Sequence, residues 1–228
     1  MEKITSTSDV STRGGVVLVP EIWGVDDALR GWARRLADEG FDVVMPDLWW
    51  RTARGGGSEG RKLDLAGPSG VMAAVEATVD SEALADVRAA LAQLPPDLPR
   101  FIMGFCIGGL YARMAACTLP GLAGAVEFYG RIVYAGTSPN KPVQPLDLIA
   151  GLGCPLQCHY GAEDPVAPPG HVDLLEQRLA GRSFPAQVFR YPACPHAFMN
   201  PNRPGYQRDA AELAWARALR FLDEHAGI

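Results

Sequence analysis

The sequence contains no long apolar run, and no stretch approaches the ~20 consecutive apolar residues that a membrane-spanning helix needs. The segment Met1–Arg13 is rich in Ser and Thr and lacks the apolar stretch of a secretory signal. Basic residues are not in excess either, since 21 Lys and Arg stand against 26 Asp and Glu and the net charge is −5. We therefore expect a cytoplasmic protein that binds neither membranes nor nucleic acid.

Cysteine is scarce and its number is odd. The chain has five cysteines and is long enough to fold without disulfide cross-links, so we expect reduced thiols. A metal site that uses Cys154, Cys158, His159, Cys194 and His196 is the alternative. It is weakly supported, because the C-x-x-x-C spacing has no second compact pair and neighbouring residues of a strand point to opposite faces. We expect no metal and no cofactor.

The composition is that of a folded α/β protein. Hydrophobic residues make up 48% and charged residues 21% of the 228 residues, which is the globular range and fits one domain spanning 1–228. Short apolar runs bounded by turn residues predict buried strands. We expect these strands at 16–20, 41–46, 101–105, 123–129, 155–160 and 187–191.

Helical patterns lie between these runs. We expect helices at 26–39, 81–94, 110–117 and 209–224, the last with Leu213, Trp215, Ala216, Leu219 and Leu222 toward the core. The Gly-rich, charged stretch at 54–70 is expected to be a surface loop. Continuous apolar strands that alternate with helices predict a mostly parallel sheet with helices on both faces.

One motif suggests a nucleophile. Gly104-Phe105-Cys106-Ile107-Gly108-Gly109 stands where the strand at 101–105 turns into the following helix. The central residue of such a turn has a strained backbone, and glycines on either side remove side chains that would collide. The helix start favours a thiolate and offers N–H groups to an oxyanion. The alternative is a buried thiol in an accidental Gly-rich turn.

A nucleophile of this kind needs a base and an acid that orients the base, and in hydrolases with this turn both follow later strands. His196 lies in the loop after the last expected strand, where a catalytic imidazole belongs. Asp164 follows the strand at 155–160 and precedes a proline that ends it, although Glu163 could be the acid instead. Structural or surface positions are expected for the other histidines, His159, His171 and His225.

These motifs resemble the dienelactone hydrolase family, a cysteine-using branch of the α/β-hydrolases. The chain matches it in Pro20-Glu21-Ile22-Trp23-Gly24, Pro46-Asp47-Leu48, the Cys106 motif, Gly161-x-x-Asp164-Pro165 and His196-Ala197-Phe198, in the family's order. The resemblance implies an α/β-hydrolase fold with Cys106 as nucleophile, His196 as base and Asp164 as its orienter. It further implies an oxyanion hole formed by the backbone N–H groups of Ile22 and Ile107.

The resemblance also gives Glu21 a role as the carboxylate that contacts the resting nucleophile. A neighbouring carboxylate disfavours a thiolate, so the resting thiol would stay largely neutral and less prone to oxidation. In the family picture, bound substrate rearranges this contact and the carboxylate then helps to take the thiol proton. A surface carboxylate beside Trp23 is the alternative.

The substrate is less specified. The family's best-known members anchor the carboxylate of a small lactone with two arginines, but this chain has Asn200 and Gly67-Pro68-Ser69-Gly70 at those places. Arg51, Arg54, Arg61 and Arg203 are the arginines in nearby loops that could substitute. Trp49 and Trp50 either wall a substrate pocket or pack as core. The residues we expect to contact substrate are Trp23, Trp49, Arg51, Tyr129, Phe198 and Arg203.

The sequence therefore predicts a hydrolase of small esters or lactones, of the carboxymethylenebutenolidase type, that acts through a Cys-His-Asp triad and an acyl-thioester. A general carboxylesterase or a thioesterase on the same triad is the alternative, followed by a non-catalytic binding module. We expect a monomer or a small homo-oligomer.

Overall fold

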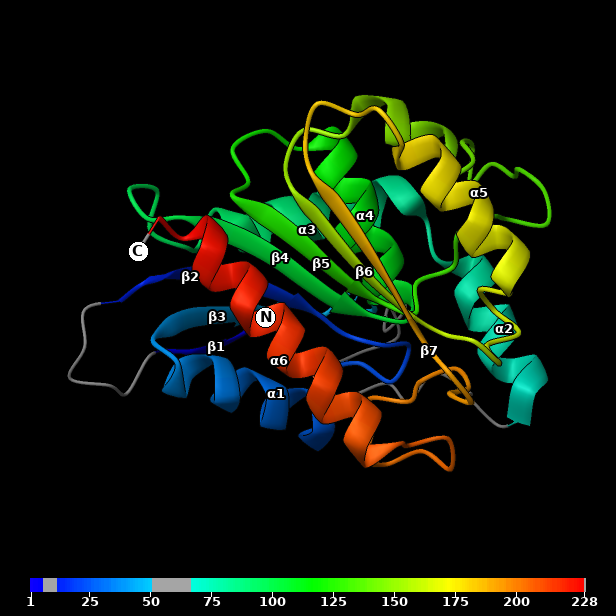
Figure 1. Cartoon of the computed structure of the whole chain (residues 1–228), viewed down its shortest axis with the longest axis horizontal. Helices are drawn as coiled ribbons and strands as arrows, with labels where there is room; N and C mark the ends of the chain where they lie inside the picture. Colours follow the sequence, from blue (N-terminus) through cyan, green and yellow to red (C-terminus); the bar gives the residue numbers. More distant parts are fainter. Residues whose placement is uncertain (6–11, 51–66, 228) are drawn as a thin grey trace.

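A mostly parallel sheet forms the centre of the molecule (Figure 1). The computed structural model describes residues 1–5, 12–50 and 67–227. The strands are β1 (Glu2–Ile4), β2 (Gly14–Val19), β3 (Phe41–Met45), β4 (Arg100–Phe105), β5 (Gly124–Phe128), β6 (Leu156–Gly161) and β7 (Ala186–Tyr191). Within the described residues they form one seven-stranded sheet in the order β1-β3-β2-β4-β5-β6-β7. Only β1 runs antiparallel to its neighbour.

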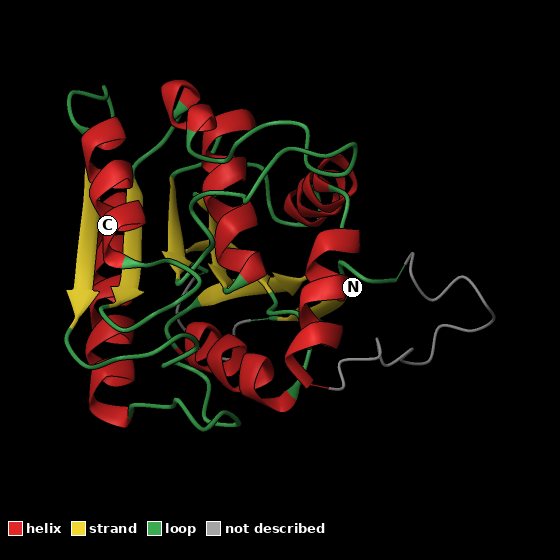
Figure 2. Cartoon of the chain, turned by 90° about the vertical axis from the view of Figure 1, so that its right-hand side faces the viewer, coloured by secondary structure: helices red, strands yellow, loops and turns green. Residues whose placement is uncertain are grey.

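Helices cover both faces of this sheet (Figure 2). They are α1 (Asp27–Asp38), α2 (Gly67–Ala77), α3 (Asp80–Leu91), α4 (Ile107–Thr118), α5 (Pro169–Leu179) and α6 (Arg208–His225), with a 3-10 helix η1 (Asp147–Gly151). Apolar side chains of α1 and α6 pack on one face of the sheet, and those of α3, α4 and α5 pack on the other. Every helix of the described segments is too short or too polar to cross a bilayer.

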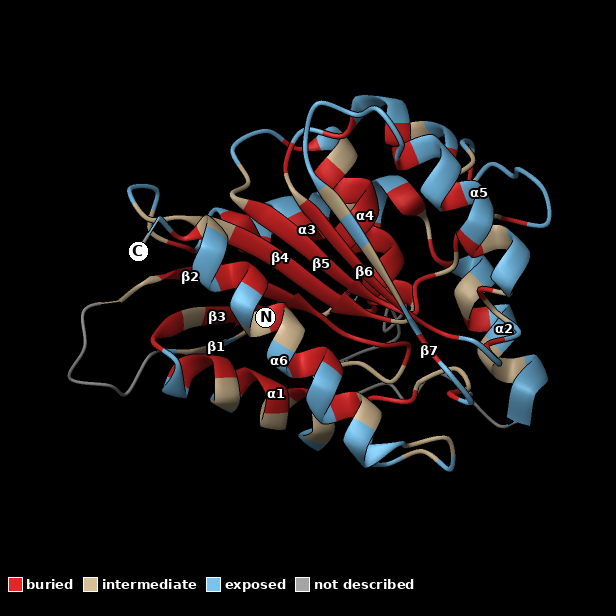
Figure 3. Ribbon diagram, viewed as in Figure 1, coloured by how far each residue is buried: buried red, intermediate tan, exposed pale blue. Residues whose placement is uncertain are grey.

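The helices form where the sequence pattern predicts them. In α1, the Asp26 side chain caps the helix by accepting from the Leu29 N–H at 2.9 Å, and Leu29, Trp32 and Leu36 are buried. Gly40, with φ of 91°, lets the chain turn from this helix into β3. The four central strands, β2, β4, β5 and β6, are buried along almost their whole length (Figure 3). This burial explains their continuous apolar runs.

Most sequence-based element bounds agree with the structure, but some expectations were wrong. The predicted strands lie within two residues of the observed ends, and the predicted helices within three. The expected loop at 54–70 falls mainly outside the described residues, and its last part is the beginning of α2. In α6, Leu213 is 49% exposed and Ala216 is exposed, because the buried face of the helix runs through Ala211, Ala214 and Trp215 instead.

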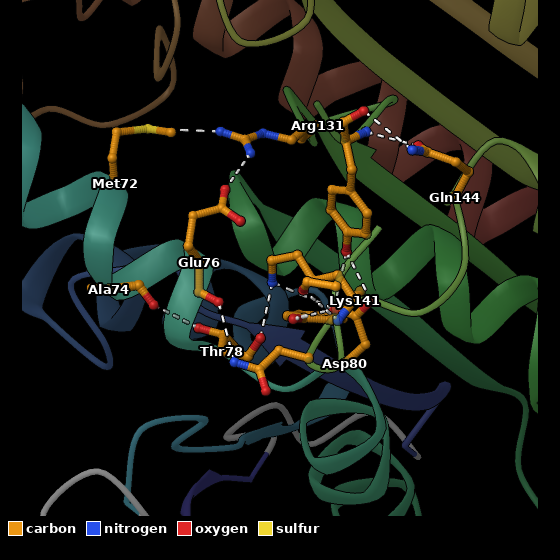
Figure 4. A network of polar contacts seen from close by, with 12 residues as sticks. Met72, Ala74, Glu76, Thr78, Asp80, Arg131, Lys141 and Gln144 are labelled. Atoms are coloured by element: carbon orange, nitrogen blue, oxygen red, sulfur yellow. Dashed lines mark hydrogen bonds and ion pairs between the residues drawn. The ribbon is translucent and has the colours of Figure 1, made fainter. Parts of the chain in front are cut away.

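A buried polar network joins α3 and α4 to the chain after β5 (Figure 4). The Asp80 carboxylate accepts hydrogen bonds from Tyr111 and Tyr134, both at 3.0 Å, and lies 3.7 Å from Lys141 Nζ. Lys141 is 1% exposed and donates to the carbonyl of Thr78 at 2.9 Å. Burial raises the pKa of Asp80, against the effect of Lys141, and lowers the pKa of Lys141. The network fixes the long loop after β5 beside α3.

The topology places four loops at one edge of the sheet. Because β2, β4, β6 and β7 are parallel, the segments that follow their carboxyl ends meet there. In open α/β sheets, ligands bind at this edge. The predicted catalytic residues all lie in these segments.

Candidate active site

The chain turns sharply at Cys106, between β4 and α4. Cys106 has φ of 55° and ψ of −120°, a conformation that costs a non-glycine residue conformational energy. Its N–H donates to the carbonyl of Phe128 at 2.9 Å, which fixes the turn to β5. The turn requires its glycines. A Cβ on Gly104 would overlap the Gly108 carbonyl, and one on Gly108 would overlap the backbone of Val19 and Pro20.

His196 lies between Cys106 and Asp164. Its Nε2 is 3.2 Å from the Cys106 Sγ, and its Nδ1 is 2.8 Å from Asp164 Oδ2. The Asp164 side chain is fully buried, and its Oδ1 accepts from the N–H groups of Val166 and Ala167 at 2.7 and 3.3 Å. Both carboxylate oxygens therefore have partners, and the imidazole is held in a fixed orientation. The chain thus brings together thiol, imidazole and carboxylate in the order that nucleophilic catalysis requires.

The electrostatic setting of His196 favours its charged form once Cys106 is a thiolate. Burial lowers the pKa of His196, but the charge of Cys106 and the hydrogen bond to Asp164 outweigh it and raise the pKa well above the usual range. The edge of the His196 ring packs against Tyr129, with 5.2 Å between ring centroids. The neutral imidazole can accept a proton from the sulfur, and the imidazolium that forms can donate it again.

Glu21 lies in the loop after β2 and is buried beside these residues. Its Oε1 accepts from the Tyr129 hydroxyl at 2.9 Å, and its Oε2 accepts from Asn200 Nδ2 at 2.7 Å. Burial raises the pKa of Glu21, although both hydrogen bonds oppose this shift. Its carboxylate makes these two hydrogen bonds and none to Cys106. Tyr129 itself has φ of 44°, so its position at the end of β5 is conformationally strained.

The two backbone amides of the predicted oxyanion hole lie in the segments that follow β4 and β2. Ile107 is the first residue of α4, so its N–H has no acceptor within that helix. Ile22 lies in a tight turn after β2, closed by a 3.0 Å hydrogen bond from the Gly24 N–H to the Glu21 carbonyl. Both residues are buried. An oxyanion hole needs both N–H groups to reach one oxygen, and this role stays a prediction for Ile22 and Ile107.

The comparisons with known proteins identify a family. The model of the dienelactone hydrolase family matches residues 2–226. The chain belongs to this family. A Salmonella typhimurium relative named "Putative carboxymethylenebutenolidase" is 34% identical over 217 residues, covering 93% of this chain and 77% of the relative. The Rhodococcus opacus "Carboxymethylenebutenolidase" is 29% identical over 229 residues, covering 98% and 86%.

A solved structure supports the same conclusion about the fold. The Klebsiella pneumoniae "Putative Dienelactone Hydrolase" superposes with a TM-score of 0.85 at 28% identity, covering 97% of this chain and 91% of that one. The expected resemblance to the dienelactone hydrolase family and the expected α/β-hydrolase fold are therefore confirmed. As a family member, the protein is a hydrolase that acts on carboxylic ester or lactone bonds.

The other predicted site residues lie in different settings. Phe198 is fully buried against Tyr129 and Tyr191, and Trp49 is buried in the core on the α3 and α4 face. The Arg203 guanidinium stacks over Trp23, with 3.4 Å between Cζ and the ring centroid. Trp50, the second tryptophan considered for a pocket wall, is 54% exposed. Arg51, Arg54 and Arg61 lie outside the described residues.

Several alternatives from the sequence can be placed. Asp164, and not Glu163, contacts His196, and Glu163 is exposed. His159 is buried, with its Nδ1 2.7 Å from the Tyr191 hydroxyl and its Nε2 2.8 Å from Gln157 Oε1. It therefore has a structural role in this dienelactone hydrolase family member. His171 is half-buried at the start of α5, and His225 bonds the carbonyl of Phe221.

All five cysteines are free, as expected for reduced thiols. Burial raises the pKa of Cys117 to about 11 and that of Cys154 to about 12, so both are poor nucleophiles. In the segments that the structure describes, no three His, Cys, Asp or Glu side chains gather in a way that could hold a metal ion.

The sequence did not indicate two partners of Glu21. Asn200 occupies the place where a substrate-binding arginine was sought, and the structure instead shows it holding Glu21. Tyr129 was expected to contact substrate, and its hydroxyl is used for the same carboxylate. Since Asn200 is 179 residues away from Glu21 in the chain, no local pattern could have revealed the contact.

Proposed function

We propose that the protein hydrolyses a small ester or lactone through an acyl-thioester on Cys106. The observation that carries this proposal is the continuous contact from Cys106 Sγ to His196 Nε2, at 3.2 Å, and from His196 Nδ1 to Asp164 Oδ2, at 2.8 Å. Thiol, imidazole and buried carboxylate in this order form an activated nucleophile. The name of the Rhodococcus opacus relative, carboxymethylenebutenolidase, supports a lactone as substrate.

In acylation, the proton of the Cys106 thiol moves to His196 Nε2 and the sulfur attacks the acyl carbon. The carbonyl oxygen becomes an oxyanion and accepts from the Ile22 and Ile107 N–H groups. The intermediate then collapses, the C–O bond breaks, and the imidazolium returns its proton to the leaving oxygen. In a lactone, this oxygen remains in the same molecule as the acyl group.

In deacylation, His196 takes a proton from water, and the resulting hydroxide attacks the thioester carbon. The carboxylic acid leaves as the C–S bond breaks, and the imidazolium returns its proton to the sulfur. Asp164 keeps Nδ1 of the imidazole as a donor throughout, so that Nε2 faces the reacting atoms. No step uses a metal or a cofactor, and EDTA should leave the rate unchanged.

Glu21 completes the proposed site. Burial raises the pKa of Glu21, so this carboxyl group can take up a proton close to the reacting atoms. The hydrogen bonds from Tyr129 and Asn200 hold the carboxyl group in place. We infer that substrate changes this arrangement during acylation.

The decisive experiment identifies the nucleophile and the substrate class together. Cys106→Ala should abolish turnover of both p-nitrophenyl acetate and a carboxylate-bearing enol-lactone, while Cys117→Ser should retain it, because burial makes that thiol unreactive. Intact-mass analysis of the wild-type protein, quenched with acid during turnover of each substrate, should show one acyl adduct, which Cys106→Ala lacks. Substantial turnover by Cys106→Ala would refute the thioester mechanism.

A neutral ester is the second candidate substrate, and Asn200 favours it. This buried residue is uncharged and already donates to Glu21, so it offers no positive charge to a carboxylate. A carboxylesterase or thioesterase on the same triad would turn over p-nitrophenyl acetate or an acyl-thioester with a higher kcat/KM than the anionic lactone. A higher kcat/KM for the lactone would instead favour the lactonase.

A further inference from the structure

Arg203 has an unusual environment for a loop arginine. Its guanidinium lies over the indole ring of Trp23, with Cζ 3.4 Å from the ring centroid. Its Nε is buried and has no hydrogen-bond partner. Among the residues that the structure describes, Arg203 forms no ion pair, although Arg30, Arg35, Arg113 and Arg190 all do. The side chain is thus held by the face of an aromatic ring rather than by a carboxylate.

On the Arg203 side, the stack begins in a hydrogen-bonded turn of the loop at 192–207, which also carries His196. The Arg203 N–H donates to the carbonyl of Asn200 at 3.0 Å, and the Asn202 N–H donates to Asn200 Oδ1 at 2.9 Å. The side-chain amide of Asn200 then bonds Glu21. The backbone that positions the guanidinium is therefore fixed relative to the imidazole.

On the other side, Trp23 belongs to the turn that presents the proposed oxyanion amide. Ile22 and Trp23 are its two central residues, between Glu21 and Gly24, and the Gly24 N–H closes it at 3.0 Å. Gly24 has φ of 74°, so the turn can leave toward α1 only through a residue without a side chain. A contact that holds Trp23 therefore also holds the turn that carries the Ile22 N–H.

We propose that Arg203 is a positioning residue for the oxyanion hole. By stacking on Trp23, it fixes the turn at 21–24 against the loop that carries His196, so that the Ile22 amide and the imidazole keep one relative position during acylation. This inference rests on the proposed function. It differs from a direct contact between Arg203 and a substrate anion, which would help only charged substrates.

The test is a double-mutant cycle of Arg203→Ala and Trp23→Leu, assayed with neutral p-nitrophenyl acetate and an anionic enol-lactone. Each single variant should lose kcat about 10-fold on both substrates, less than the ~10²-fold loss that follows removal of an oxyanion donor. KM should change by less than about 2-fold. The double variant should lose no more than either single one, since both remove the same contact. Trp23→Phe, which keeps an aromatic face, should retain most of the activity.

Arg217→Ala is the matched control. Its guanidinium also stacks on a ring, 4.3 Å from the centroid of Phe189, but away from the proposed oxyanion amides, so kcat should not change. Circular dichroism checks that each variant is folded. Should Arg203→Ala unfold, Arg203→Lys carries the same expectation, because it keeps the charge but not the planar stack.

Three results would overturn the inference. A rise in KM restricted to the anionic lactone would make Arg203 a substrate anchor, and unchanged kinetics or additive losses would remove any role through Trp23. Failure of the proposed function has a different signature, because Cys106→Ala would then retain turnover whatever the Arg203 variants do.

Discussion

The two buried carboxylates of the site are bound in different ways. Asp164 accepts two backbone N–H groups on one oxygen and contacts His196 with the other. Glu21 has only two neutral donors, Tyr129 and Asn200. Burial raises the pKa of Glu21 even though both of these donors oppose the shift. In the proposed mechanism, Asp164 therefore orients the base through its contact with His196.

The His196 imidazole is expected to act in both half-reactions. His196→Gln should lower kcat by at least ~10²-fold, because glutamine can neither take the thiol proton nor activate water. The measurement is steady-state turnover of p-nitrophenyl acetate, with circular dichroism as a check of folding. His225→Gln is the control, since this histidine bonds the carbonyl of Phe221 and should leave kcat unchanged. A loss of less than 3-fold in His196→Gln would contradict its role.

His159 should make the protein sensitive to acid. Burial lowers the pKa of His159 from 6.5 to about 3, so the folded state keeps it neutral while the unfolded chain takes up a proton below pH 6.5. Stability from this residue is present above pH 6.5 and is lost as the pH falls toward 3. Between pH 7 and pH 5 the loss amounts to about 2 kcal/mol.

The comparison with His159→Gln isolates this contribution. Urea unfolding at pH 7 and pH 5 gives the free energy of unfolding of both proteins. Between these pH values, the wild-type free energy should fall by about 2 kcal/mol more than that of His159→Gln. Glutamine removes the titratable group while it can still bond Tyr191 or Gln157. Equal pH dependence in the two proteins would show that His159 is not held neutral.

At the scale of elements, the turn from β4 into α4 depends on close backbone contacts. Gly108→Ala would place a Cβ against the carbonyls of Val19 and Pro20, where no flexible side chain can move away. We expect a loss of at least ~1–3 kcal/mol in the free energy of unfolding, together with a fall in kcat as Cys106 shifts. Urea unfolding and turnover of p-nitrophenyl acetate measure the two effects.

Gly31→Ala is the matched control for that substitution. Gly31 lies in the interior of α1, and a Cβ there would meet nothing within 4 Å. The same change should therefore stabilise the protein by about 0.5–1 kcal/mol and leave kcat unchanged. Stabilisation by both substitutions would show that the turn tolerates a side chain at Gly108.

The elements that the sequence revealed are those with a local pattern. β2, β4 and β6 are unbroken apolar runs, and the glycines around Cys106 mark the turn by themselves. β1 has three residues, of which none is buried, and α2 begins with Gly-Pro-Ser-Gly, so neither shows a helical or strand pattern. Cys106, His196 and Asp164 could be found because each follows a recognisable strand.

Contacts between distant segments could not be predicted in the same way. Lys141 has the composition of a surface residue, yet it is buried because Asp80, Thr78 and Tyr134 surround it in the fold. The hydrogen bond between Asn200 and Glu21 likewise exists only once β2 and β7 stand in one sheet. The charge of such a side chain favours exposure to water, so a sequence pattern predicts a surface position. Burial becomes favourable only where the fold supplies polar partners.

At the scale of the whole molecule, a buried ion pair stabilises the contact between layers. Arg113 of α4 donates to both carboxylate oxygens of Glu127 in β5, at 2.6 and 2.9 Å, and both side chains are fully buried. The same guanidinium bonds the carbonyl of Arg131 and the hydroxyl of Tyr160 in β6. The pair therefore connects the helix behind the Cys106 turn to two strands and to the loop after β5.

Replacing one member of this ion pair should lower the free energy of unfolding more than replacing both members. Arg113→Met leaves the Glu127 carboxylate buried without a cation, so the free energy of unfolding should fall by about 3–5 kcal/mol at pH 8. The double variant, Arg113→Met with Glu127→Leu, should recover most of that loss. Burial already raises the pKa of Glu127 to about 7, and without Arg113 it rises further, so the single variant should regain stability as the pH falls and the carboxyl group takes up a proton. Urea unfolding of both variants between pH 8 and pH 5 measures this. If the double variant were as unstable as the single one at every pH, then the loss of packing around Met, and not the unpaired charge, would explain the result.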